Sequence, residues 1–165
     1  ASVPSSDGVF FVPALAGLGA PHWQPDARGA LLGLTRGSTR AHVVRAVLEG
    51  IALQIADLAD AMAADYGGAF QTMRVDGGAA ANDLLMQMQS DFLGQKVERP
   101  EMVETTALGA AYLAGLGLGV WSDAAELRAL NPVGKAFEPK LDAGERNAFR
   151  KVWAEAVRRT APLGG

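Results

Sequence analysis

The sequence predicts an α/β fold in which a partly parallel sheet is flanked by helices. Short segments rich in β-branched and aromatic residues alternate with longer segments whose apolar residues recur every three or four positions. Within Met73–Gln87, one such strand runs through two glycines directly into a helical pattern, which is typical of parallel βα units. Because 165 residues suffice for one domain with its own core, we expect residues 1–165 to form a single domain.

Two short strands are expected near the start of the chain. Val9–Leu15 contains a run of aromatic and β-branched residues, which glycines and Pro21 bring to an end. The glycine- and proline-containing segment Gly17–Arg28 is expected to be a loop. Gly29–Leu34 follows as a second short apolar strand.

A long helix is expected from Ala41 to Tyr66, because large apolar residues recur there at helical spacing. These residues are Val44, Val47, Leu48, Ile51, Ile55, Leu58 and Met62. Ser38 or Thr39 is suited to cap the start of this helix, and Gly67–Gly68 is suited to end it.

Strands and helices alternate in the middle of the chain. Phe70–Val75 and Gln95–Glu98 are expected to be strands, the second ended by Pro100. Ala81–Leu93 lies between them and is expected to be a helix. Its core face is expected to carry Leu84, Leu85, Met88 and Phe92.

Three further helices are expected toward the end of the chain. They span Thr105 or Thr106 to Leu116, Asp123 to Leu130, and a last helix that Asp142 caps and that runs to Arg159. Val133–Phe137 is expected to be extended.

Composition argues against several classes of function. The chain has 15 basic and 18 acidic residues, a net charge of −3, so charge gives no reason to expect nucleic acid or an anionic membrane as a partner. No apolar run is long enough to span a bilayer and no signal-peptide pattern opens the chain, so we expect a cytoplasmic protein. The lack of cysteine excludes disulfides and thiolate chemistry, and His22 and His42 lie too far apart in sequence for a helical metal pair.

The strand–glycine–glycine–helix segment is the best candidate for a functional site. Gly77 and Gly78 form the expected turn after Asp76, and Asn82 lies in the first turn of the expected helix. Free backbone N–H groups at a helix start attract anions such as phosphate, and glycine leaves room for the anion to approach. Asn82 is suited to cap the helix or to bind a base or ribose. From these residues alone, a tight turn without a ligand stays open.

Two common nucleotide-binding motifs are absent from the sequence. No Gly-x-x-x-x-Gly-Lys-Ser/Thr occurs, so this is not a P-loop protein. GLGAPH and GLGVWS both lack the last glycine of G-x-G-x-x-G, which leaves a Rossmann dinucleotide site unsupported.

Four segments resemble the FGGY family of carbohydrate kinases. Phe10–Gly37 resembles the family stretch FVPAF-GLGAPYW-P-ARG, with His22 in place of the usual tyrosine. Gly29–Glu49 fits one of the family's signature patterns, and Arg74–Asp83 (RVDGGAAAND) resembles the adenosine motif of the actin-like superfamily. Val97–Trp121 resembles the segment and helix that close the domain. The resemblance covers nearly the whole chain and favours the members that phosphorylate glycerol.

The resemblance implies an actin-like, ribonuclease H-like ATPase fold, of which this chain is the later part of the C-terminal nucleotide-binding domain. It implies transfer of phosphate from ATP to a polyol hydroxyl, with Mg²⁺ bound through the nucleotide. Glycerol and ATP/ADP are then the expected partners; xylulose, gluconate or another sugar, or a non-catalytic nucleotide-binding module, are the alternatives. Gly77 and Gly78 are implied to lie near the α-phosphate, Ala79 to line the adenosine pocket and Asn82 to contact the adenosine. The family often forms oligomers, so a homo-oligomer stays open.

The same resemblance places the catalytic groups outside this chain. In the family, the general-base aspartate, the glycerol-binding residues and the loops that hold the terminal phosphates precede the matched segments. The chain also opens without methionine and enters a strand within a few residues. We therefore expect an incomplete domain with an unpaired sheet edge and an exposed apolar face, no catalytic residue, and no glycerol phosphorylation by the chain alone.

Five other residues are expected to have structural roles. Asp76 is expected to fix its turn or bond the amides that follow it. His42 is expected at the surface or as a helix cap. His22 and Trp23 are expected to pack, the alternative being that their loop faces an interdomain cleft. Glu49 is expected to be a buried carboxylate bonded to loop backbone.

Overall fold

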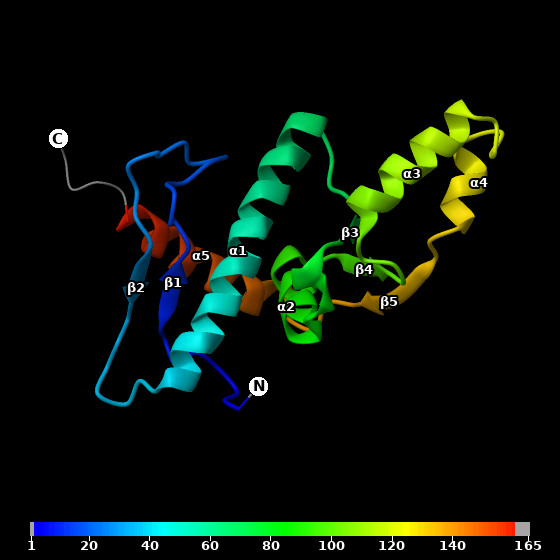
Figure 1. Cartoon of the computed structure of the whole chain (residues 1–165). Helices are drawn as coiled ribbons and strands as arrows, with labels where there is room; N and C mark the ends of the chain where they lie inside the picture. The colour runs from blue at the N-terminus through cyan, green and yellow to red at the C-terminus, as the bar shows by residue number, and fades with distance from the viewer. Residues whose placement is uncertain (1, 161–165) are drawn as a thin grey trace.

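Strands and helices alternate as expected in the computed structural model, which describes residues 2–160 apart from the side chains of residues 128 and 129 (Figure 1). The elements are β1 (Phe10–Val12), β2 (Ala30–Leu32), α1 (Arg40–Tyr66), β3 (Thr72–Arg74), the 3₁₀ helix η1 (Gly78–Ala81), α2 (Asp83–Leu93), β4 (Lys96–Pro100), α3 (Thr105–Gly117), α4 (Ala124–Ala129), β5 (Val133–Phe137) and α5 (Ala143–Arg158). Each expected strand and helix is present, with ends shifted by a few residues.

The strands form two separate sheets. Strands β1 and β2 pair antiparallel, with Phe11 opposite Leu31. In the second sheet β3 pairs parallel with β4, and β4 pairs antiparallel with β5. The prediction of a partly parallel sheet is therefore confirmed. Within residues 2–160, β3 and β5 each pair with β4 alone, so both edges of this sheet are open.

Helix α1 lies between the β1–β2 pair and α2 and contacts both β1 and α2 (Figure 1). Its most buried face consists mainly of small residues, namely Ala46, Gly50, Ala52, Ala56 and Ala59, together with Leu53 and Glu49. The large apolar residues that indicate the helix are less buried, and Val44 and Met62 are about half exposed. The small face is needed because β1 approaches closely: a Cβ atom on Gly50 would overlap the carbonyl oxygen of Phe11.

A continuous apolar core connects β1, α1, α2, the second sheet and α5. Helix α2 contributes Leu85, Met86, Met88 and Phe92, which meet Val97 of β4 and Phe137 of β5 on one side and Leu53 of α1 and Trp153 of α5 on the other. Three of the four residues expected on the core face of this helix are fully buried, and Leu84 is half-buried. The position of α2 at the centre of the core fixes where its N-terminal end lies.

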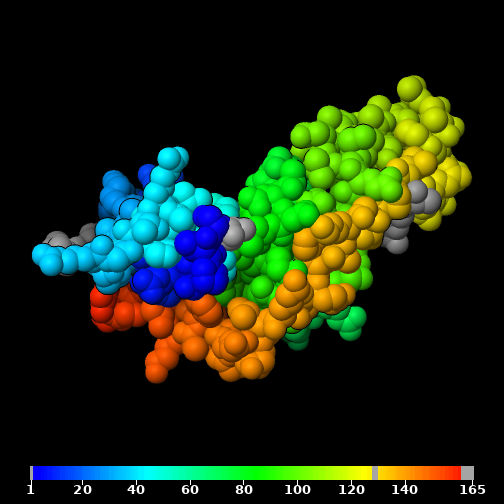
Figure 2. Space-filling model, turned by 90° about the horizontal axis from the view of Figure 1, so that it is seen from below, coloured from blue at the N-terminus to red at the C-terminus, as the bar shows by residue number. Residues whose placement is uncertain are grey.

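Helices α3 and α4 extend away from this core (Figures 1 and 2). Helix α3 is apolar on several faces, and Leu113 and Leu118 near its C-terminal end are largely exposed. Trp121 folds back on the helix, where its ring contacts Gly115 and meets Tyr112 edge-on at 5.4 Å. Among the helices that the structure describes, none has the length and apolar character that a membrane crossing requires.

Helix α1 carries two of the residues for which a structural role is expected. The N-cap residue Thr39 donates its backbone N–H to Nδ1 of His42 at 3.2 Å, so His42 helps to cap the helix as expected. Glu49 is buried as expected, but its partner is not loop backbone. Its Oε1 accepts from Nε of Arg45 at 2.7 Å, one helical turn earlier, because the i, i+4 spacing brings these side chains together.

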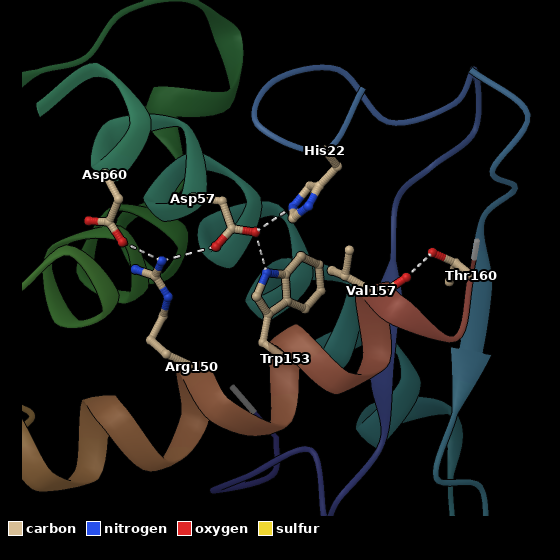
Figure 3. Close-up of polar contacts among 7 residues, drawn as sticks. All are labelled: His22, Asp57, Asp60, Arg150, Trp153, Val157 and Thr160. Carbon is tan, nitrogen blue, oxygen red and sulfur yellow. Dashed lines mark hydrogen bonds and ion pairs between the residues drawn. The ribbon is translucent and has the colours of Figure 1, made fainter. Parts of the chain in front are cut away.

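The carboxylate of Asp57 joins the loop at Gly17–Arg28 to α1 and α5 (Figure 3). It accepts hydrogen bonds from Nε1 of Trp153 at 2.7 Å and from Nη2 of Arg150 at 2.9 Å, and it lies 3.1 Å from Nε2 of His22. The Asp57 side chain is only 11% exposed, so these bonds are largely shielded from water. His22 therefore has a packing role, as expected.

Trp23, next to His22, does not have the packing role expected for it. Its side chain is 75% exposed and its backbone has a φ of +50°. The turn that brings His22 toward Asp57 directs the neighbouring ring toward solvent in the described part of the chain.

Replacing Asp57 with alanine is expected to destabilise the fold by about 2–4 kcal/mol, because the buried N–H of Trp153 loses its acceptor and the guanidinium of Arg150 loses one of its two. Asp60→Ala is the matched control, since Asp60 binds the same Arg150 at 2.6 Å but is largely exposed, and we expect it to cost less than about 1 kcal/mol. Urea unfolding followed by circular dichroism measures both. Equal losses for the two variants would contradict a central role for Asp57.

Candidate functional site

The segment Asp76–Asn82, called the glycine turn below, connects β3 to α2. Gly77 has φ +80° and ψ 172°, a conformation that only glycine adopts without strain. The four residues Gly78–Ala81 then form η1, and α2 begins at Asp83. The expected helix start at Ala81 was therefore two residues early, because a 3₁₀ turn separates the glycines from the α-helix.

Three contacts hold the glycine turn on the second sheet and the segment that follows it. The N–H of Gly77 donates to the carbonyl oxygen of Val103 at 2.8 Å. The hydroxyl of Thr105 donates to the carboxylate of Asp76. Asp76 therefore fixes the turn, which is one of the two expected roles, but it does so by binding the start of α3 and not by bonding the amides that follow it. Nη1 of Arg99 donates to the carbonyl oxygen of Ala80 at 2.7 Å.

Two backbone donors of η1 have no acceptor within residues 2–160. They are the N–H groups of Gly78 and Ala79, which open η1 and so precede its first internal hydrogen bond. The space around Gly78 is open, since a Cβ atom built there meets no atom within 4 Å. Free amides beside open space form a site that an anion can approach.

Asn82 is the N-cap residue of α2, which confirms one of the two roles considered for it. Its Oδ1 accepts from the backbone N–H groups of Leu84 and Leu85, both at 3.1 Å. The cap therefore occupies the N–H groups of Leu84 and Leu85, while the N–H groups that open η1 stay free. Capping through Oδ1 turns the Nδ2 donors of the exposed Asn82 side chain away from the helix.

A pocket lies on each side of the residues around Asp76. One, of about 330 Å³, is bounded by the ends of β3 and β4 and by α4, with Asp76, Thr105 and Asn131 among its polar residues. The other, of about 250 Å³, lies between α1, β3 and the glycine turn and includes Ala79. In this second pocket the buried side chain of Gln89 has an Oε1 without a hydrogen-bond partner in the described residues.

A group of charged side chains supports the start of α2. Arg99 of β4 and Lys135 of β5 are directly opposite each other in the sheet, and the carboxylate of Asp83 lies between them. Asp83 is 2.6 Å from Nζ of Lys135 and 2.8 Å from Nη1 of Arg99. Hydrogen bonds from Lys135 and then Arg99 lower the pKa of Asp83 below its ordinary value, so the carboxylate is charged at neutral pH.

The structure brings the four predicted site residues, Gly77, Gly78, Ala79 and Asn82, together in one turn at the end of β3. Sequence reasoning missed Arg99 and Asp83, because their contacts join residues 16 or more positions apart. The charged residues within Lys96–Arg99 indicate a strand with a polar face, but they do not indicate which residues that face contacts. No group of three or more histidines, aspartates or glutamates within residues 2–160 is arranged to hold a metal ion.

Comparison with known proteins assigns the family. The family model "FGGY family of carbohydrate kinases, C-terminal domain" matches residues 1–118. The glycerol kinase of Rhodopirellula baltica is 56% identical over 160 residues, which are 97% of this chain and 30% of that protein. The solved structure of Plasmodium falciparum glycerol kinase with ADP is 38% identical, with a TM-score of 0.87 over 99% of this chain and 32% of that one.

A gluconate kinase from Lactobacillus acidophilus has the same fold at lower identity. It is 25% identical, with a TM-score of 0.80 over 98% of this chain and 33% of that one. The chain thus spans about a third of the length of the relatives it matches. The expected fold is confirmed as the actin-like, ribonuclease H-like fold of these kinases. By its match to the C-terminal domain model and its structural likeness to these enzymes, the chain belongs to the FGGY family of carbohydrate kinases.

Proposed function

We propose that this chain forms part of the ATP site of an enzyme that transfers phosphate from ATP to glycerol, producing glycerol 3-phosphate. The identity of 56% to a glycerol kinase across nearly the whole chain carries this proposal. It exceeds by far the identity to the gluconate kinase, so glycerol is favoured over gluconate as the acceptor. No observation favours a purely structural module.

The glycine turn supplies donors suited to a nucleotide. In this proposal the free N–H groups at Gly78 and Ala79, next to Gly77, face the α-phosphate, where backbone donors stabilise negative charge without a side chain in the way. Ala79 lines the adenosine pocket, and the Nδ2 donors of Asn82 contact the adenosine. The bound ADP of the Plasmodium falciparum enzyme supports a nucleotide in this family.

Mg²⁺ is proposed to enter this site with the nucleotide, held by phosphate oxygens. Phosphoryl transfer depends mainly on positioning and charge neutralisation, and a magnesium ion that bridges phosphates supplies much of the second. The contribution of this chain is therefore binding geometry: it fixes the nucleoside and the inner phosphate. We propose that the group that accepts the glycerol proton lies outside this chain.

A chimera tests the whole proposal. Residues 1–160 of this chain replace the matching segment of the Rhodopirellula baltica glycerol kinase, and glycerol-dependent release of ADP is measured. We expect kcat within about tenfold of the parent enzyme, because fewer than half of the matched positions differ and the acceptor-binding residues come from the parent. A folded chimera without glycerol-dependent release of ADP would contradict the proposal, and the chain on its own is expected to show no glycerol-dependent turnover.

Gly78→Ala is expected to weaken ADP binding at least about tenfold without a change in the unfolding midpoint. The backbone φ of Gly78 is not positive and its surroundings are open, so the fold tolerates a methyl group there. A bound phosphate would meet that methyl group. Gly68→Ala is the matched control, since Gly68 also has open surroundings and lies outside the turn. Calorimetric titration with Mg²⁺ and ADP measures both, and unchanged affinity in Gly78→Ala would contradict a phosphate at this turn.

Two replacements of Asn82 separate its capping role from its binding role. Asn82→Asp keeps an acceptor for Leu84 and Leu85 and is expected to preserve stability within about 0.5 kcal/mol, whereas Asn82→Ala is expected to lose about 1 kcal/mol. Both lack the Nδ2 donor, so both are expected to weaken ADP binding by about three- to tenfold. Thermal unfolding and ADP titration of the two variants give the comparison. Full affinity in Asn82→Asp would assign Asn82 to capping alone.

A further inference from the structure

The glycine turn is open around its two glycines. Side chains added at Gly77 or Gly78 would meet no neighbouring atom within 4 Å. Ala80 is buried against the core, but the backbone that carries the free N–H groups lies on the open side. A turn that binds a ligand through backbone amides must nevertheless keep those amides in place, because donors that reorganise on binding reduce affinity.

Arg99 supplies the one side-chain hydrogen bond to the backbone of η1 among the described residues. Nη1 of Arg99 lies 2.7 Å from the carbonyl oxygen of Ala80 and 2.8 Å from Oδ1 of Asp83, so its two hydrogens serve two acceptors. The first acceptor belongs to η1 and the second to the first turn of α2. One guanidinium therefore fixes the 3₁₀ turn and the α-helix relative to each other.

Arg99 is itself held firmly. Its side chain is only 18% exposed, and its guanidinium carbon lies 5.6 Å from the centre of the Phe137 ring. Lys135, directly opposite in the sheet, contacts the same ring and the same carboxylate of Asp83. Two cations at directly opposed positions repel each other, and Asp83 between them offsets that repulsion. Both hydrogens of Nη1 are directed at Ala80 and Asp83, so Arg99 acts on the turn through the geometry of these two bonds.

We propose that Arg99 is a positioning residue for the nucleotide, which holds the free N–H groups of Gly78 and Ala79 in place through the carbonyl group of Ala80. This inference rests on the proposed function, since it concerns the same site. Arg99 does not touch the nucleotide; it fixes the backbone that does.

The test compares Arg99→Met with Lys135→Met in the 165-residue chain. Both variants remove a cation from Asp83 and from the Phe137 ring, but only Arg99 contacts Ala80. Affinity for ADP with Mg²⁺ is measured by calorimetry. We expect a loss of about tenfold in Arg99→Met and a change of less than about twofold in Lys135→Met.

Hydrogen exchange in the unliganded protein provides the second measurement. The N–H groups of Gly77, Ala80 and Asn82 are hydrogen-bonded within or next to the turn, so their exchange reports on its opening. We expect faster exchange at these three amides in Arg99→Met than in Lys135→Met. Arg99→Lys, which keeps the charge but not the two-acceptor geometry, replaces Arg99→Met if the latter does not fold, and it is expected to show a smaller change in the same direction.

Three other outcomes would contradict the proposal, each in a different way. Equal affinity and exchange in the two methionine variants would remove the positioning role of Arg99 while leaving the nucleotide site intact. Weaker ADP binding with unchanged exchange would mean that Arg99 contacts the nucleotide directly. Failure of the unmodified chain to bind ADP would instead refute the proposed nucleotide role of the glycine turn, and the inference would fail with it.

Discussion

The burial of helix α2 is the constraint on which the other features depend. Its core face packs against α1 and α5 on one side and against β4 and β5 on the other. A helix buried on this much of its surface has little freedom to shift, because interiors are close-packed. The N-terminal end of α2 is thereby fixed at Asp83, and the glycine turn must span the short path from the end of β3 to that point. The core thus sets where the site lies, and the contacts of the turn with β4 and the segment after it hold its shape.

Most of the fold could be predicted from the sequence because its signals are local. Apolar spacing located α1, and Asp142 located the start of α5 through a cap that uses the N–H of Glu145. It was harder to predict which face of α1 is most buried, because that face consists of small residues, which the close approach of β1 requires. That approach depends on the carbonyl group of Phe11, which lies 39 positions before Gly50 and leaves no local signal in the helix.

The candidate site was predictable to a different extent. Its turn was located from two glycines and an asparagine, which lie within one short segment of the sequence. The contacts that support the turn could not be located in this way, because Arg99, Val103 and Thr105 come from β4 and the segment after it. The same limit explains why Asp76 was assigned to its own turn: a carboxylate beside glycines commonly bonds local amides, and only the tertiary structure shows Thr105 beside it.

The two glycines of the turn differ in whether the fold requires glycine at their positions. That difference separates a structural requirement from a functional one. Gly77 has a positive φ, so the fold alone accounts for glycine there. Gly78 has neither a positive φ nor a close neighbour, and nothing in the described protein requires it to lack a side chain. Asn82 is similar: aspartate or serine would cap α2 equally well through an oxygen, so capping does not account for its Nδ2 donors. At both positions the fold explains only part of the residue's chemistry, and the remainder is what the proposed nucleotide on the open side of the turn would require.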